Sequence, residues 1–324
     1  MADYPATVYQ GIQVGVEATP GTPVPANKKL LAVSMKPSPQ VESAPFRAMG
    51  NKYASFVSPN KEWSSINIEG KPTFNEIVYL LASLLHYQVP VQQGVSTAYK
   101  WTFVSNTSSE DVGKTFTIEQ GDADSAWQVA GVRVSGLTFS FSRNQISVNG
   151  NGVGEKFTTG ITLTASPTSL APLPILPTML KFYMADSQAG LASATAMTNA
   201  FELEWSLTDK FGLAWPVGQD PVAVEGVPNA SSRIKVATNP AGMALIAALR
   251  TATTKWIRVE AIGKTIADTY NHKFTLDFPA QIQSIGDPAD HENVYTVDYG
   301  LLPIHDSTWA KSMNLEVTTD LAAL

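Results

Sequence analysis

The sequence predicts a mainly β protein organised as two tandem domains. Segments in which apolar and polar residues alternate recur along the chain, and this period of two is that of half-buried strands. The 324 residues also include 22 glycines and 21 prolines, which is typical of β proteins with many turns. A chain of this length is long enough to bury two cores in domains of about 150 residues each.

The predicted boundary between the domains is a linker at residues 166–178. This segment contains four prolines, at Pro167, Pro172, Pro174 and Pro177. The first domain then comprises residues 1–165 and the second residues 179–324. One large domain is the alternative that the length leaves open.

Two proline-rich segments of the first half are predicted to contain no helix. Residues 1–27 are interpreted as an extended arm of the kind that reaches a neighbouring chain, with Pro20 and Pro23 as candidate subunit contacts. Residues 37–62 are predicted to form a long loop or an extended hairpin. Loops of this length in compact domains are usually functional or disordered. The candidate subunit contacts here are Pro45, Phe46 and Pro59.

A helix is predicted after the strand-like residues 66–68. Thr73 and Glu76 have the spacing of a capping box, in which each side chain bonds to the other residue's backbone N–H at a helix start. The apolar residues around them recur at the steps of one helical face, which predicts packing against a core. These residues are Phe74, Ile77, Val78, Leu81 and Leu85.

The same order of features returns in the second half and predicts an internal duplication. The matching pairs are Ile66 with Ile234, Ile68 with Val236, Pro72 with Pro240, Ile77 with Leu245 and Leu81 with Leu249. Asn239 is predicted to cap the second helix, with Pro240 at its first position. Downstream, the Lys-Trp pair at 100–101 matches that at 255–256, and FTIE at 116–119 matches FTLD at 274–277.

Alternation predicts individual strands in both halves. It covers residues 132–134, 137–141 and 146–148 in the first half, and residues 180–182, 201–205 and 295–299 in the second. We expect these strands to be antiparallel. The NGNG sequence at 149–152 is predicted to be a turn.

Composition and charge exclude several classes of protein. Cysteine is absent, so there are neither disulfides nor thiolate metal sites. The net charge is −6, and residues 1–165 hold 12 acids and 12 bases, so the acidic excess lies in the second half. A protein that binds nucleic acid through its phosphates needs an excess of Lys and Arg, so this charge argues against that class. No apolar run is long enough for a membrane span, and the N-terminus lacks the pattern of a secretory signal.

No motif predicts catalysis, a metal or a cofactor. The four histidines lack the paired spacing of metal ligands on one helix. The acids and histidine at 287–292 are interpreted as a solvated turn. The chain contains no nucleophile-elbow or phosphate-loop motif, and the glycines at 150, 152 and 154 precede no helix. We therefore expect a non-enzymatic protein without a cofactor.

Seven tryptophans divide into two groups by their sequence surroundings. Trp63, Trp101, Trp205 and Trp256 lie in strand-like segments and are predicted to fill the cores. The others lie near turns, where aromatic side chains can anchor subunit contacts. These candidate contact residues are Trp127, Trp215 and Trp309.

In its pattern of segments the sequence resembles the major tail tube proteins of long-tailed bacteriophages with flexible, non-contractile (siphovirus-type) tails. The marks of the resemblance are GVEATPGTP at 15–23, the strand and helix at 66–85, YKWTF at 99–103 leading to FTIE at 116–119, and GVRVSGLTF at 131–139. They cover most of residues 12–155. The second half matches more weakly, chiefly at 231–252 and 273–299.

The resemblance implies a structural virion protein that polymerises into a hollow tail tube for DNA. Each tube domain would be a β-sandwich or barrel with one flanking α-helix, and inner sheets would join between subunits around the lumen. Rings would stack through the N-terminal arm and the long loop. With two tube domains per chain, the ring would be a trimer with pseudo-sixfold symmetry, although six chains per ring remain open.

The implied partners are further copies of the chain, the tape-measure, tail-tip and tail-terminator proteins, and phage DNA in passive contact. No membrane partner is expected. Assembly would take place in the host cytoplasm, and the final location would be the phage tail. Closing sheets into a ring also removes exposed sheet edges, which are otherwise an aggregation hazard.

Three acids that alternate along predicted strands are candidates for the lumen wall. Glu202, Glu204 and Asp298 would repel phosphates and let DNA slide. Solvent-facing outer strands are the alternative for these residues. For the whole protein, the alternatives are a decoration, minor capsid or adhesin-like β-sandwich protein and, less favoured, a carbohydrate-active enzyme with paired carboxylates.

Overall fold

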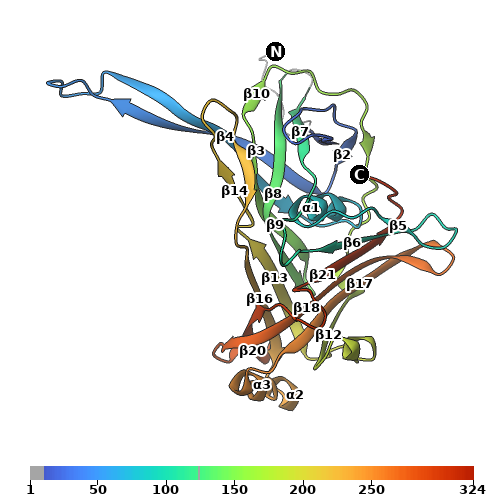
Figure 1. Cartoon of the computed structure of the whole chain (residues 1–324). Coiled ribbons are helices and arrows are strands. Elements are labelled where there is room, and N and C mark those ends of the chain that lie inside the picture. The colour runs from blue at the N-terminus through green and yellow to red at the C-terminus, as the bar shows by residue number, and fades with distance from the viewer. Residues whose placement is uncertain (1–10, 123–124) are drawn as a thin grey trace.

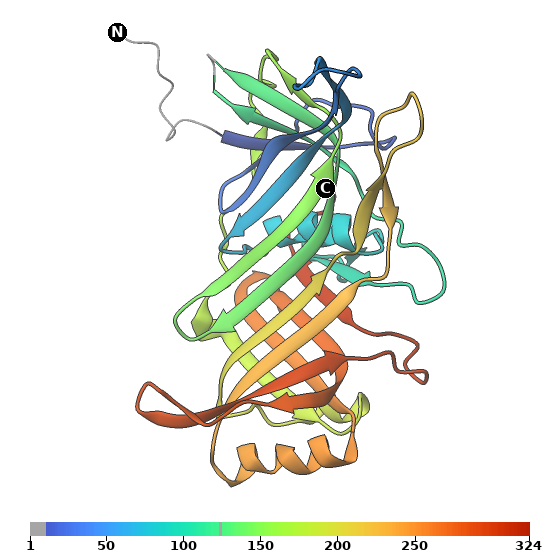
Figure 2. The same cartoon turned by 90° about the vertical axis from the view of Figure 1, so that its left-hand side faces the viewer.

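The computed structural model describes residues 11–122 and 125–324, and it confirms a mainly β protein (Figure 1). Two sheet layers pack face to face. The first layer has the strand order β3 (Val33–Phe46), β4 (Phe56–Gly70), β9 (Ile146–Gly154), β8 (Ala126–Ser142), β13 (Ala200–Thr208), β16 (Asn229–Ala237) and β20 (Val294–Pro303). Figure 2 shows these strands lying diagonally side by side.

The second layer covers one face of the first. Its strand order is β5 (Val91–Gln92), β6 (Tyr99–Val104), β21 (Asn314–Thr319), β18 (Tyr270–Ile285), β17 (Lys255–Ala267) and β12 (Leu180–Ala185). The layers join where β18 pairs with β20. Aromatic rings fill the space between the layers. The ring centroid of Phe274 on β18 lies 6.1 Å from that of Phe139 and 6.0 Å from that of Phe141, both on β8.

A smaller group of strands extends the sheet around the first part of β8. Strand β8 pairs there with β7 (Phe116–Gly121) and β10 (Phe157–Thr159). The order continues through β1 (Gly11–Val16), β2 (Lys28–Leu30) and β11 (Thr168–Ser169). Strand β19 (Ala289–His291) pairs with β20, and β14 (Phe211–Ala214) with β15 (Val222–Glu225) forms a separate hairpin.

Helix α1 (Glu76–Leu84) is enclosed by the protein on all sides. All nine of its residues are buried, so it is a central helix rather than an amphipathic one on the surface. Thr73 accepts the N–H of Glu76 at 3.0 Å, as the predicted capping box requires. The Glu76 carboxylate instead accepts hydrogen bonds from the N–H groups of Leu31, Ala32 and Val33, where the chain passes from β2 into β3.

The second helical segment comprises α2 (Pro240–Met243) and α3 (Leu245–Thr251), at the bottom of Figure 1. The predicted cap is confirmed, because the Asn239 side chain accepts the N–H of Gly242 at 2.8 Å and Pro240 is the first helical residue. The order of strand, helix and strands recurs in the two halves. The strand pairing differs, since β17 pairs with β18 whereas β6 pairs with β21.

Strands from both sides of the predicted boundary pair with each other. The β8–β13 and β6–β21 pairs both join the two predicted domains. The predicted linker also packs on the body, because Leu170 and Ile175 are buried. The division at 166–178 stays a prediction.

The expected extended arm is wrong for residues 11–27. Strand β1 pairs with β7 and β2 of its own sheet, and the Glu17 carboxylate accepts hydrogen bonds from Gly21, Thr117 and Gly131. The segment carrying Pro20 and Pro23 is therefore a loop held on β7. Residues 1–10 lie outside the described residues.

The predicted turn at 149–152 is also wrong, because these residues lie inside β9. Glycine is needed there for close approach of strand β8. A Cβ on Gly150 would lie 2.3 Å from the carbonyl oxygen of Gly136, and one on Gly152 would lie 2.7 Å from that of Arg133. The actual turn comprises residues 143–145, between β8 and β9.

A carboxyl group beside this N-terminal loop gives the fold a dependence on pH. Burial, with the charges of Glu17 and Asp220, raises the pKa of Glu155 to about 7. In the unfolded chain the same carboxyl group has its ordinary pKa of 4.5. The protonated Glu155 side chain therefore contributes its full stabilisation below pH 4.5, and this stabilisation is lost as pH rises through 7.

We therefore expect Glu155→Gln to raise the free energy of unfolding at pH 8 by about 1 kcal/mol, with solvent screening included. At pH 4 the effect should be near zero. Urea unfolding at both pH values measures it, with Asp186→Asn as an exposed control. An equal effect of Glu155→Gln at the two pH values would contradict this assignment.

A buried ionic cluster joins the β14–β15 hairpin to the body. The Lys210 ammonium pairs with Asp111, and the side chains of both are fully buried. Glu225 lies 3.3 Å from the same ammonium and accepts the Asp111 N–H at 2.6 Å. The Arg133 guanidinium donates to the Asp111 carbonyl oxygen at 2.7 Å and completes the cluster.

Candidate functional site

The first sheet layer has one buried face and one exposed polar face. Along β13, Leu203, Trp205 and Leu207 are buried against the second layer, whereas Glu202 and Glu204 point to the other side. The same alternation holds along β8, β9 and β16. We call this exposed side of strands β4, β9, β8, β13, β16 and β20 the polar face.

Side chains on the polar face align in rows across the strands. One row is Glu69, Asn149, Thr138, Ser206 and Ser231. The next is Ser147, Ser140, Glu204, Arg233 and Gly300. A third is Ser142, Glu202, Lys235 and Asp298. The side chains in these three rows are thus hydroxyl, amide and charged groups, with no apolar side chain among them.

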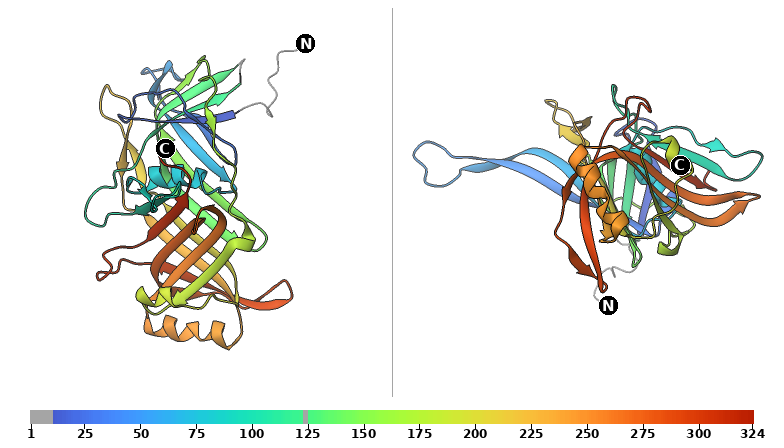
Figure 3. Two further views of the ribbon diagram at one scale, coloured as in Figure 1. Left: turned by 90° about the vertical axis from the view of Figure 1, so that its right-hand side faces the viewer. Right: turned by 90° about the horizontal axis from the view of Figure 1, so that it is seen from below.

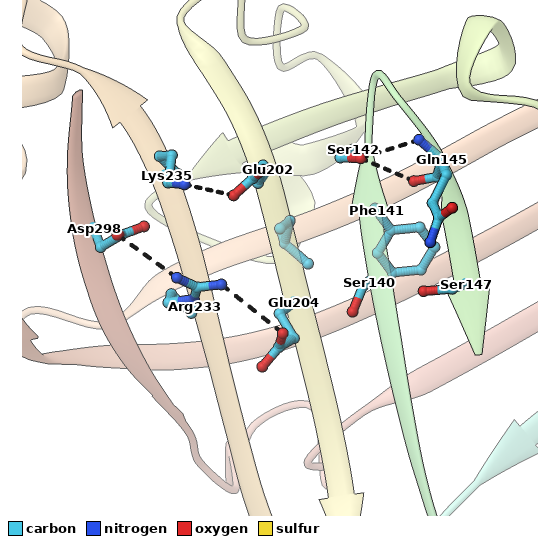
Figure 4. A pocket seen from close by; sticks show the side chains of 11 residues that line it. Ser140, Phe141, Ser142, Gln145, Ser147, Glu202, Glu204, Arg233, Lys235 and Asp298 are labelled. Atoms are coloured by element: carbon cyan, nitrogen blue, oxygen red, sulfur yellow. Dashed lines mark hydrogen bonds and ion pairs between the residues drawn. The ribbon is translucent and has the colours of Figure 1, made fainter. Parts of the chain in front are cut away.

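The predicted lumen acids lie together around a hollow of 270 Å³ in this face (Figure 4). Two bases of β16 lie between them. Lys235 pairs with Glu202 at 2.7 Å, and Arg233 lies 3.9 Å from Glu204 and 3.6 Å from Asp298. Burial alone raises the pKa of Glu202, but the hydrogen bond and charge of Lys235 outweigh burial and lower it.

The three acids that the sequence singles out share this face with two bases that the sequence reasoning missed. Arg233 and Lys235 alternate with buried Ser232, Ile234 and Val236 along β16, so the period of two that located the acids also places these bases on the same face. The consequence is a nearly compensated surface rather than an acidic one. Whether the face lines a lumen stays a prediction.

The predicted segment 37–62 is an extended hairpin, formed by β3 and β4. Its outer part, residues 41–60, projects far from the body in Figure 1 and in the right-hand view of Figure 3, and every residue in it except Ala48 is exposed. We call it the hairpin arm. It carries Pro45, Phe46 and Pro59, and Phe46 stacks on Phe56 with ring centroids 4.9 Å apart.

The hairpin arm exposes an unusual amount of apolar side chain. Met49 is fully exposed, and five other large residues are more than half exposed: Val41, Phe46, Tyr53, Phe56 and Val57. An isolated two-stranded ribbon is marginally stable in water, and contiguous exposed apolar surface usually marks an interaction site. The arm therefore has the composition of a contact surface.

Each tryptophan predicted at a subunit contact packs on an aromatic ring of its own chain. Trp127 stacks on Phe157, Trp215 meets Trp63 at 5.6 Å, and Trp309 meets Trp256 at 5.0 Å. Trp215 is still 36% exposed. It packs at the base of the arm, where the Lys61 ammonium lies 4.9 Å from the centroid of its ring. Their role between subunits stays a prediction.

Three of the four tryptophans predicted in the cores are confirmed there. Trp101, Trp205 and Trp256 are buried. Trp63 is half-buried on the outer side of β4, because it alternates with the inward-facing Ser64 and Ile66. The core prediction for Trp63 is therefore wrong.

Among the described residues, no group of three or more histidines and acids could hold a metal ion. The described part of the chain also has no helix long and apolar enough to span a membrane. Searches against models of known protein families and against curated proteins find no match to this chain.

Proposed function

We propose that this chain is a structural subunit that polymerises into stacked rings and so forms a hollow bacteriophage tail tube. The observation that carries the proposal is the hairpin arm. A projecting two-stranded ribbon with six large exposed apolar side chains is costly to leave in water, and burying it on a second copy removes that cost.

The position of the arm favours a second copy beside the polar face. In Figure 1 the arm projects to the left. Figure 2 shows the molecule from that side, and there the first layer faces the viewer. A copy contacted by the arm would lie on this side of the molecule. Polar faces of successive copies can then surround one space.

The strand order supports three chains per ring. Four strands of the first half and three of the second form one continuous sheet, joined in register where β8 pairs with β13. In a ring of single-domain subunits this junction would lie between chains. Three two-domain chains would then supply six repeats with pseudo-sixfold symmetry.

The edge strand β3 is consistent with a contact made by side chains. Among the described strands it pairs with β4 alone, and it contains Pro37, Pro39 and Pro45, which have no N–H to donate to a further strand. The open edge is thus protected against uncontrolled pairing. The contact with a neighbour would use the arm.

In this proposal the polar face lines the conduit and meets phage DNA in passing. The tube would sit in the virion tail after assembly in the host cytoplasm, together with tape-measure, tail-tip and tail-terminator proteins. No catalytic role and no cofactor is assigned to any residue.

Light scattering of the purified chain across a concentration series tests the proposal. We expect the mean mass to rise steeply above a threshold concentration and to fall again on dilution, because a head-to-tail contact does not close. A constant mass of a small oligomer would overturn the proposal and favour a decoration or adhesin-like protein.

A further inference from the structure

The basic residues on the outer side of the first sheet layer all lie beside carboxylates of neighbouring strands. Strands β3, β4 and β16 carry four such bases, and β9, β13 and β20 carry none. The single base of β8, Arg133, belongs to the buried cluster. The pairs are Lys36 with Glu69 at 3.1 Å, Lys61 with Glu42 at 2.8 Å, Lys235 with Glu202 at 2.7 Å, and Arg233 with Glu204 and Asp298.

We propose that Glu202, Glu204 and Asp298 clamp the two bases of β16, so that duplex DNA can pass the polar face without binding to it. The inference rests on the proposed function for the passage of DNA. The clamp itself is a property of the single chain.

The clamp acts on the groups that would otherwise bind phosphate. Arg233 and Lys235 are two positions apart on one side of β16, which separates them by roughly 7 Å along the strand. Non-specific binding of DNA depends on such cations, because each one that neutralises a phosphate releases a counterion. Free Arg233 and Lys235 would supply two adjacent phosphate contacts.

Both bases lie within ion-pair distance of carboxylates, the half-exposed Arg233 at longer range than Lys235. Arg233 lies between Glu204 on β13 and Asp298 on β20, so its guanidinium meets a carboxylate on either side (Figure 4). Lys235 is only 18% exposed and pairs at 2.7 Å. Three carboxylates against two cations leave the cluster with one negative charge, and an arriving phosphate would have to displace a carboxylate already in place.

The test frees the two bases while the strands stay intact. Glu202→Gln, Glu204→Gln and Asp298→Asn are combined in one clamp variant. The matched control combines Glu42→Gln, Asp186→Asn and Glu316→Gln, which changes the net charge equally and frees Lys61, Lys255 and Lys100 at scattered places. Fluorescence anisotropy of a labelled duplex DNA measures binding at 50 and 200 mM salt.

We expect the clamp variant to bind the duplex at 50 mM salt and to bind it about tenfold more weakly at 200 mM. This is the salt dependence expected for two phosphate contacts. Wild type and the control should bind much more weakly. Adding Arg233→Gln and Lys235→Gln to the clamp variant should abolish binding. The inference is overturned if the clamp variant binds no tighter than the control, or if wild type already binds through Arg233.

The DNA-binding measurement and the test of the proposed function can fail independently of each other. Polymerisation of the wild-type chain is measured by mass and does not involve DNA. Failure of the clamp variant to bind DNA would leave the assembly proposal standing. A wild-type chain that never polymerises would leave the clamp as a property of the polar face while removing its role in a conduit.

Discussion

Replacing residues 42–61 by Asn-Gly is expected to abolish polymerisation while the body of the protein stays folded. Val41 and Glu62 are partners in the hairpin register, so a two-residue turn can connect them. The deleted segment is almost wholly exposed and contributes little to the core. Light scattering should then report a constant small mass at every concentration.

The size of this effect follows from the apolar surface of the arm. Full burial of one large apolar side chain contributes about 1.5–3 kcal/mol. The deletion removes five of the six exposed apolar residues, a loss comparable with the roughly 8 kcal/mol of a micromolar association. As a control, Val95→Ser with Val217→Ser removes exposed apolar residues elsewhere. An arm-deleted chain that still polymerises would refute the role of the arm.

Lys210→Met is expected to lower the free energy of unfolding by about 3–5 kcal/mol. The methionine retains the aliphatic part of the side chain but removes the ammonium that pairs with Asp111 and Glu225. The Asp111 carboxylate is then buried without the ammonium, with only the hydrogen bonds from Ser105 and the Asn106 N–H remaining. Urea unfolding of the full chain at low concentration measures the change.

A second substitution separates this charge effect from packing. Adding Asp111→Asn to Lys210→Met neutralises the orphaned carboxylate and should recover part of the lost stability. Lys255→Met is the surface control, because its partner Asp186 is 81% exposed, and it should cost less than about 1 kcal/mol. A loss of similar size in Lys210→Met and Lys255→Met would contradict the importance of the buried cluster.

Local elements of the fold could be predicted because their signals are local. Helix α1 follows from its apolar periodicity, and the cap of α2 follows from Asn239 and Pro240. An extended hairpin is one of the two forms that the sequence predicts for residues 37–62, and β3 and β4 form it. Its prolines exclude a helix. They are tolerated in a strand at the edge of a sheet, because the N–H that proline lacks is not needed there for pairing with a further strand.

Contacts between distant residues could not be predicted in the same way. The partner of Lys210 lies 99 positions away, and the sequence around either residue does not indicate burial. Glu76 has the spacing of a capping residue, yet its carboxylate binds a turn more than 40 positions earlier. The glycines of β9 suggested a turn, because close approach of β8 depends on tertiary structure.

The candidate site was half predictable. Alternation placed Glu202, Glu204 and Asp298 on one side of their strands, but the order β13, β16, β20 that inserts Arg233 and Lys235 between them is set by strand pairing. The pairing of these three strands therefore makes the charge of the surface nearly compensated.

Electron microscopy of the concentrated, purified chain distinguishes a tube-forming subunit from a discrete oligomer. We expect hollow tubes or stacked rings, with three chains in each ring and the hairpin arms between neighbouring copies. Discrete small particles at every concentration, with no rings and with the arms still free in solution, would contradict this expectation.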